Sequence, residues 1–292
     1  MGETQMREWY ITNSYGVEIS FNAGDPFRLT NIEGLGVNNV SFSESQTIHA
    51  VGTTISASSV EGREITLEGD MKSTYANRRK LLDTLLPDND LIFRVVDKEA
   101  DVDHYIKCQV KKSPEISEDQ EVYKKFQVVL YASYPYWRDN KESIVAFVTY
   151  NSGFKFKRSF SNTVPWKVGS RDVNQLTYAV NKGSDKTGFL ARFEATGYVK
   201  GPEILKVLTQ ENIKFPNLEM GEGDVLLVST YENERYCKLI SNGIEKNIYY
   251  LMDDGSNFFV LDKGSNAVRF DAVSNIGNLY CTISFANTYV GE

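Results

Sequence analysis

The sequence predicts a mainly β protein with two domains, and three observations lead to this fold class. A chain of 292 residues is long enough for two domains of ordinary size. Aromatic residues make up 12% of the chain, against only 7 prolines, and aromatic side chains suit the pleated, half-buried surface of a sheet. Apolar and polar residues also alternate in many short segments, which is the pattern of strands with one face in a core.

The first half is expected to contain several such strands. Ile65 and Leu67 alternate with Thr66 and Glu68, and the same period returns over residues 106–110 and 126–130.

One helix is expected over about residues 74–86. Its apolar positions fall on one side at helical spacing: Tyr75, Leu82, Leu85 and Leu86. Ser73 or Thr74 is expected to cap its start, and Pro87 to end it. The basic residues 78–80 on the other side indicate a solvated surface, with docking to an acidic neighbour as the alternative.

The second half alternates in the same way and carries frequent turn signals. Strands are expected over residues 189–195, 236–240, 267–270 and 280–285, with turns such as Asn242-Gly243 between them. Short strands at this spacing favour an antiparallel sandwich of the jelly-roll type. Because the composition changes after Trp137, we place the domain boundary near residue 140, which gives domains 1–140 and 141–292. A linker or long hairpin is expected within residues 141–185.

Charge and cysteine content exclude several classes of function. The net charge of −7 argues against a protein that binds nucleic acid through a basic face. Cys108, Cys237 and Cys281 are far apart and lack a CxxC spacing, so we expect free, partly buried thiols and neither disulfides nor zinc. No signal peptide or apolar run of about 20 residues is seen, so we expect synthesis in a cytoplasm and no membrane anchor.

No catalytic constellation emerges from the sequence. The chain has only two histidines, His49 and His104, which leaves few general bases, and we expect His104 to be structural. The run from Asp253 to Asn257 predicts a turn, with a calcium site at Asp253 and Asp254 as the alternative. The 39 acidic residues leave the carboxylate pair of a glycosidase open. The residues therefore favour binding or assembly over catalysis, with no cofactor.

Several segments give the chain a family resemblance. The run Tyr131-Ala132-Ser133-Tyr134-Pro135-Tyr136-Trp137-Arg138-Asp139 resembles the end of the N-terminal domain in siphophage distal tail proteins. The same order and spacing hold for Gly34-Leu35-Gly36, for residues 62–69, and for the helix with Arg78, Leu82 and Leu85 followed by Leu86-Pro87. Asn181-Lys182-Gly183, Pro202-Glu203-Ile204 and Gly223-Asp224-Val225 are similar to the family's C-terminal domain.

This resemblance implies both a fold and a role. The fold is an N-terminal β-barrel-like belt domain with one α-helix, followed by a C-terminal galectin-like or jelly-roll β-sandwich. The role is that of a structural virion protein at the tail tip, assembled in the host bacterial cytoplasm. Six copies would form a ring that joins the tail tube and tape-measure protein to the tail-associated hub protein, through which DNA only passes. The C-terminal domain would anchor a receptor-binding protein. Related parts occur in tail-like bacteriocins and prophages.

The resemblance also singles out eight residues whose role, structural or at an interface, is left open. They are Gly62, Gly69, Arg78, Leu82, Tyr134, Pro135, Tyr136 and Trp137. For Trp137 the two possibilities are a plug at the end of the first domain and a contact with a neighbouring subunit. Two other functions stay open for the whole chain: a carbohydrate-binding or adhesin-like sandwich, with weak sugar binding by the C-terminal domain, and a glycoside hydrolase.

Overall fold

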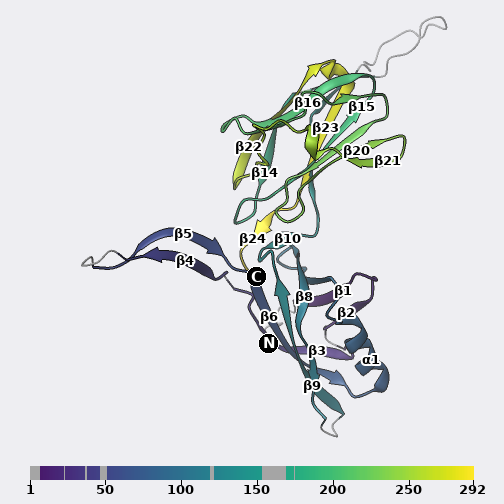
Figure 1. Ribbon diagram of the computed structural model, residues 1–292. Helices are drawn as coiled ribbons and strands as arrows, with labels where there is room; N and C mark the ends of the chain where they lie inside the picture. Colours follow the sequence, from purple (N-terminus) through teal and green to yellow (C-terminus); the bar gives the residue numbers. More distant parts are fainter. Residues whose placement is uncertain are drawn as a thin grey trace, which may run out of the picture. The chain divides into compact units, whose positions relative to one another are not determined.

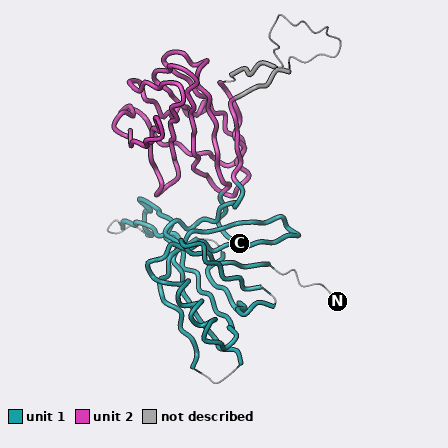
Figure 2. The backbone as a smooth tube through the Cα atoms, turned by 90° about the vertical axis from the view of Figure 1, so that its right-hand side faces the viewer, with its two compact units in different colours: residues 1–141, 288–292 teal, residues 142–287 magenta. Residues whose placement is uncertain are grey.

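The computed structural model divides the chain into two compact units (Figure 2). Unit 1 consists of Met1–Lys141 together with Thr288–Glu292, and unit 2 consists of Glu142–Asn287. The structure describes residues 7–22, 24–36, 38–46, 51–118, 122–152, 169–173 and 175–292.

The predicted mainly β fold is confirmed in both units (Figure 1). Unit 1 contains α1 (Tyr75–Thr84) and the strands β1 (Glu8–Asn13), β2 (Glu18–Ser20), β3 (Phe27–Glu33), β4 (Val40–Ser45), β5 (Thr54–Val60), β6 (Arg63–Lys72), β7 (Leu91–Asp97), β8 (Val102–Ile116), β9 (Tyr123–Ala132), β10 (Trp137–Asp139) and β24 (Thr288–Tyr289). Its main sheet is antiparallel, in the order β2-β1-β7-β8-β9-β6-β3, with β10 on β8 and β24 on β10.

The main sheet of unit 1 curls around one core. Strands at both ends of its order contribute to the same buried cluster, which includes Ile19 from β2, Phe27 from β3 and Phe93 from β7. Among the described residues no pairing joins β2 to β3, so the sheet is barrel-like with an open seam.

The last five residues belong to unit 1, although the sequence analysis assigned them to the C-terminal domain. The reason is a long-range pairing: β24 runs antiparallel to β10, with Tyr289 opposite Trp137 and Thr288 opposite Arg138. The chain therefore crosses between the units twice, once after Lys141 and once after Asn287.

The single expected helix is present as α1, and Thr74 caps it. The Thr74 side chain accepts a hydrogen bond from the Asn77 backbone N–H at 3.2 Å. The expected buried face is wrong by about one residue, because Leu81 and Leu85 pack into the core, whereas Tyr75 is 79% exposed. The apolar positions allow two adjacent stripes, and packing against the sheet selects the one through Leu81.

Strands β4 and β5 form a hairpin apart from the main sheet. They pair only with each other in the described part of the chain, and Figure 1 shows them extending as an arm beyond the rest of unit 1. Every residue of β5 is exposed, and no residue of either strand belongs to a core cluster. We call this element the arm.

Unit 2 is a sandwich of two antiparallel sheets. The six-stranded sheet has the order β11 (Ser143–Ala146), β23 (Leu279–Phe285), β15 (Leu190–Ala195), β19 (Val225–Ser229), β20 (Tyr236–Ser241) and β21 (Ile244–Asn247). The five-stranded sheet has the order β14 (Leu176–Asn181), β22 (Gly264–Ser274), β16 (Val199–Lys206) and β17 (Asn212–Lys214), with β18 (Glu219–Met220) also on β16. β12 (Val148–Ser152) pairs separately with β13 (Gly169–Val173). The short 3-10 helices η1 (Tyr249–Leu251) and η2 (Ile276–Asn278) complete the unit.

The two sheets of unit 2 share one aromatic core. Phe193 and Phe285 come from the six-stranded sheet and Phe270 from the five-stranded sheet, and all three lie in the same buried cluster. The Phe147 ring meets that of Phe270 edge-on, with the centroids 5.1 Å apart. Alternation of buried and exposed residues along each strand produces this arrangement, as the sequence predicted.

Candidate functional site

The aromatic run at the end of the first domain is split between interior and surface. Trp137, at the start of β10, is fully buried in the core of unit 1, with its ring 5.8 Å from that of Phe93. Its indole N–H has no hydrogen-bond partner among the described residues, so within the single chain the ring is held by apolar packing. Tyr134 and Tyr136 are half-buried with rings 5.2 Å apart, and the Arg138 guanidinium lies 4.6 Å above the Tyr134 ring.

Arg63 ties this run to two other segments, and the sequence analysis missed it. Its side chain is buried and donates to the carbonyl oxygens of Pro135 at 2.9 Å, Gly34 at 2.9 Å and Gly36 at 2.7 Å, and also to Val290 O. A signal was present, because Arg63 shares the inward face of β6 with Ile65 at a spacing of two. Burial lowers the pKa of Arg63, and the charge of Glu292 opposes that effect.

Of the two signature glycines, Gly69 lies in β6 and Gly62 directly precedes that strand. Both allow close packing. A Cβ on Gly69 would lie 2.3 Å from Arg28 O and 2.7 Å from the Phe126 ring, so only glycine fits between β3 and β9 here. A Cβ on Gly62 would lie 2.2 Å from the Tyr131 hydroxyl, at the edge of a groove of about 580 Å³.

The other two signature residues lie on α1. Arg78 forms an ion pair with Glu118, with Nη1 and Oε1 3.1 Å apart, and both side chains are exposed. Leu82 is half-buried. Arg78 therefore lies at the surface of unit 1. Exposed ion pairs of this kind contribute little to stability.

His104 on β8 is the centre of a charged cluster that includes Glu292. Its Nε2 lies 3.0 Å from Asp139 Oδ1, its Nδ1 bonds the Glu292 carboxylate, and its ring stacks on Tyr289 with centroids 4.1 Å apart. Burial lowers the pKa of His104, but hydrogen bonds to Asp139 and Glu292 outweigh burial and raise it to about 9. Burial, then the Asp139 charge, raises the pKa of Tyr289 to about 12. His49 lies outside the described residues.

The arm carries an exposed apolar patch. Val40 lies opposite Val60 in the β4–β5 ladder, and Phe42, two residues along β4, shares their face. The side chains are 43%, 44% and 54% exposed for Val40, Val60 and Phe42. We call these three residues the arm patch. An isolated two-stranded hairpin is only marginally stable in water, so this element favours a partner.

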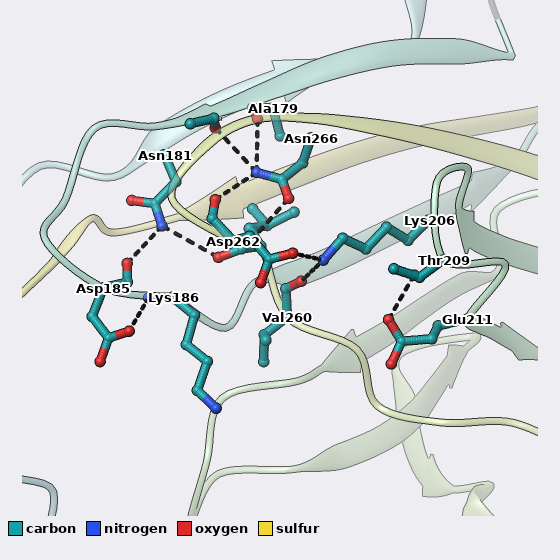
Figure 3. Close-up of polar contacts among 12 residues, drawn as sticks. Ala179, Asn181, Asp185, Lys186, Lys206, Thr209, Glu211, Val260, Asp262 and Asn266 are labelled. Atoms are coloured by element: carbon teal, nitrogen blue, oxygen red, sulfur yellow. Dashed lines mark hydrogen bonds and ion pairs between the residues drawn. The ribbon is translucent and has the colours of Figure 1, made fainter.

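Polar side chains at one end of unit 2 hold loops in place (Figure 3). The buried Lys206 ammonium donates to Val260 O at 3.0 Å and to the Asp262 carboxylate. Asn266 donates to Asp262 O at 2.7 Å, and Asn181 donates to Asp185 O at 2.8 Å. Apart from the contact of Lys206 with the Asp262 carboxylate, these hydrogen bonds pair buried polar groups with backbone oxygens, which is a structural arrangement.

The three thiols and two of the carboxylates have shifted pKa values. Burial raises the pKa of the Cys108 and Cys237 thiols to about 12 and that of Cys281 well above its usual range, which keeps them protonated and weakly nucleophilic. Lys98 lowers the pKa of Glu8, and Arg94 lowers that of Asp103, the opposite of what a general acid requires.

Protein groups contact the Asp253 carboxylate at the expected turn. The Asp253 carboxylate accepts the Gly255 backbone N–H at 3.1 Å and lies 3.3 Å from the Lys214 ammonium. Within the described residues no group of three or more metal-ligating side chains occurs. The same residues include no helix long and apolar enough to cross a membrane.

Comparison with solved structures finds a similar fold in phage proteins. No protein-family model matches the sequence, and no curated protein matches it. The chain is similar to the crystal structure of the Dit protein of phage SPP1, described as a paradigm of the hub adsorption apparatus in phages that infect Gram-positive bacteria. The TM-score is 0.65 at 14% identity, over 96% of this chain and 98% of that one.

A second solved assembly gives the same result. A chain of the phage P2 baseplate, in its activated conformation with Ca, matches with a TM-score of 0.56 at 11% identity, over 97% of this chain and 98% of that chain. The Sr form of that baseplate matches with a TM-score of 0.52 at 11% identity. The predicted resemblance to distal tail proteins is therefore confirmed at the level of the fold, across both units.

Proposed function

We propose that this protein is a structural component of a phage-type tail tip, in which copies of unit 1 assemble into a hexameric ring. The observation that carries the proposal is the arm, an exposed hairpin with an apolar patch and no core of its own. The fold supports it, because the similarity to tail and baseplate proteins extends over nearly the whole chain.

The arm suits a head-to-tail contact between copies. Its apolar patch, Val40, Phe42 and Val60, lies on an element that extends beyond the main sheet, and a single chain leaves it exposed. If each copy covers the arm of the next, one repeated contact closes a ring. Burial of the patch would also stabilise a hairpin that is marginal by itself.

The remaining partners follow from the same role. In the proposal the ring joins the tail tube and tape-measure protein to the tail-associated hub protein, and unit 2 anchors receptor-binding components. The protein would act in the virion tail tip after assembly in the host cytoplasm. No catalysis is proposed, in keeping with the protonated thiols and the ionised carboxylates described above.

Native mass spectrometry and negative-stain microscopy of the purified chain test the ring. We expect the unmodified protein to form hexamers, and the double variant Phe42→Ser/Val60→Ser to remain monomeric because it removes two of the three patch side chains. Both residues are exposed in the single chain, so the free energy of unfolding of the monomer should change by less than about 0.5 kcal/mol.

The matched control is Ile244→Ser, which removes a side chain that is 60% exposed on the β20–β21 hairpin of unit 2. This variant should still form hexamers. Hexamers formed equally well by the arm variant would contradict the role of the arm. A chain that stays monomeric and binds purified cell-wall polysaccharide would favour a carbohydrate-binding module instead, for which the exposed Tyr249 and Tyr250 would be the first residues to examine.

A further inference from the structure

We propose that Thr288–Glu292 forms a releasable strap on unit 1, and that protonated His104 is the residue that holds it closed. The strap is a property of the single chain, so the proposal does not depend on ring assembly. It concerns the return crossing of the chain from unit 2, which ends on this strap.

Few backbone contacts attach the strap. Tyr289 and Thr288 pair with β10 over two positions only, and the Glu292 N–H donates to Leu35 O at 2.9 Å. Thr288 is buried, and Tyr289 is partly buried and packs against the core of unit 1, so the strap contributes one apolar side chain to that core. Segments with few buried apolar contacts open locally at much lower free energy than the whole domain, so the strap can open while the main sheet stays folded.

Charge supplies the rest of the attachment. His104 lies between Asp139, which belongs to β10, and Glu292, which belongs to the strap. A protonated imidazole bridges these two carboxylates, whereas a neutral one leaves Glu292 close to a like charge. The Tyr289 ring covers one face of the imidazole and also faces Asp139.

Two arginines near this cluster have partners of their own. Arg63 attracts Glu292 while its guanidinium bonds Val290 O and three other carbonyl groups of unit 1. On the neighbouring strand β7, Arg94 is paired with Asp103, at 2.6 Å between Nε and Oδ1. Val95, opposite His104 on β7, carries no charge. The protonation state of His104 therefore decides whether the Glu292 carboxylate of the strap faces a positive charge.

The direction of the pH effect follows from the raised pKa of His104. Closure of the strap favours the protonated imidazole, so its contribution is complete below the ordinary histidine value of about 6.5 and is lost as the pH rises through about 9.

Hydrogen exchange measured by mass spectrometry tests the strap at the peptide level. At pH 7, His104→Gln and Glu292→Gln should each raise the exchange rate of amides 288–292 at least tenfold, while the amides of β8 keep their protection. In the unmodified chain, the same amides should approach the rates of the variants between pH 8 and 10, after correction for intrinsic exchange. The control Lys98→Gln removes the surface pair with Glu8 on the same unit and should leave the strap unchanged.

Nuclear magnetic resonance titration gives an independent readout. The chain contains two histidines, so a His49→Gln background assigns the remaining imidazole signal to His104. We expect His104 to titrate near pH 9 and at least one pH unit lower in Glu292→Gln. Unchanged strap exchange in both variants would overturn the proposal, as would equal acceleration in β8, which would indicate global destabilisation. A His104 titration unaffected by Glu292→Gln would overturn it as well.

Discussion

Trp137 shows how one residue can mark the end of a domain without touching the solvent. It begins β10 directly after Pro135 and Tyr136, and its ring fills the core beside Phe93. The chain leaves the main sheet after Ala132, at the end of β9, and re-enters it at Trp137. Pro135 lies in the connection between the two strands, where its missing N–H costs no ladder hydrogen bond. The burial supports packing as the role of this residue, whereas Tyr134 and Tyr136 stay partly open to other contacts.

Replacement of Trp137 by alanine separates packing from an interface. We expect Trp137→Ala to lower the free energy of unfolding of unit 1 by about 3–5 kcal/mol, because it removes a fully buried ring and leaves a cavity. Denaturant unfolding followed by circular dichroism measures the change. Tyr75→Ala, which removes an exposed ring of the same unit, should cost less than about 0.5 kcal/mol. A stable Trp137→Ala monomer that fails to form rings would instead place Trp137 at a subunit contact.

The sequence does not predict which distant residues a given side chain will contact. Arg63 meets Val290 across 227 positions, and His104 meets Glu292 across 188. Periodicity predicts that Arg63 and His104 lie in strands, but nothing local indicates which carbonyl or carboxylate each will find. A structural role is expected for His104 from the sequence, but its positive charge is not. The raised pKa of His104 depends on the Asp139 and Glu292 carboxylates, which are distant in the sequence.

At the scale of elements, α1 depends on its first turn. The Thr74 side chain satisfies the Asn77 N–H, one of the donors that a helix leaves unpaired at its start. Thr74→Ala should therefore destabilise unit 1 by about 1 kcal/mol, whereas Thr74→Ser, which keeps the hydroxyl, should cost only a few tenths. Thermal unfolding of the two variants side by side checks the difference, and equal midpoints would show that the cap contributes nothing.

The strands and the helix could be predicted, but the arm and the helix face could not. Alternation over residues 65–67, 106–110 and 126–130 places β6, β8 and β9 correctly, since each has one face in the core. In the arm, Val40 and Phe42 alternate with serines, which is compatible with a strand. Because neither arm strand contributes to a core cluster, the pattern does not indicate that the hairpin lies apart from the main sheet. For α1, a short helix with two adjacent apolar stripes does not reveal which stripe the sheet will cover.

At the scale of the whole molecule, the net charge of the chain affects whether the proposed ring would bind DNA. Each copy adds a net charge of −7, so a ring accumulates negative charge that repels phosphates. We expect the assembled ring to show no measurable affinity for double-stranded DNA by fluorescence anisotropy, even at low salt, where phosphate contacts are strongest. Salt-dependent binding would reveal a basic channel and contradict this expectation.

The double crossing of the chain also sets an order of events during synthesis. A ribosome makes the body of unit 1 first, then all of unit 2 between Lys141 and Thr288, and only afterwards the strap. Domains generally fold as they emerge, from the amino-terminal end. Unit 1 begins to fold first but is completed only after unit 2 has been translated, because Arg63 and His104 bond Val290 and Glu292. A chain interrupted within unit 2 would thus leave unit 1 unfinished.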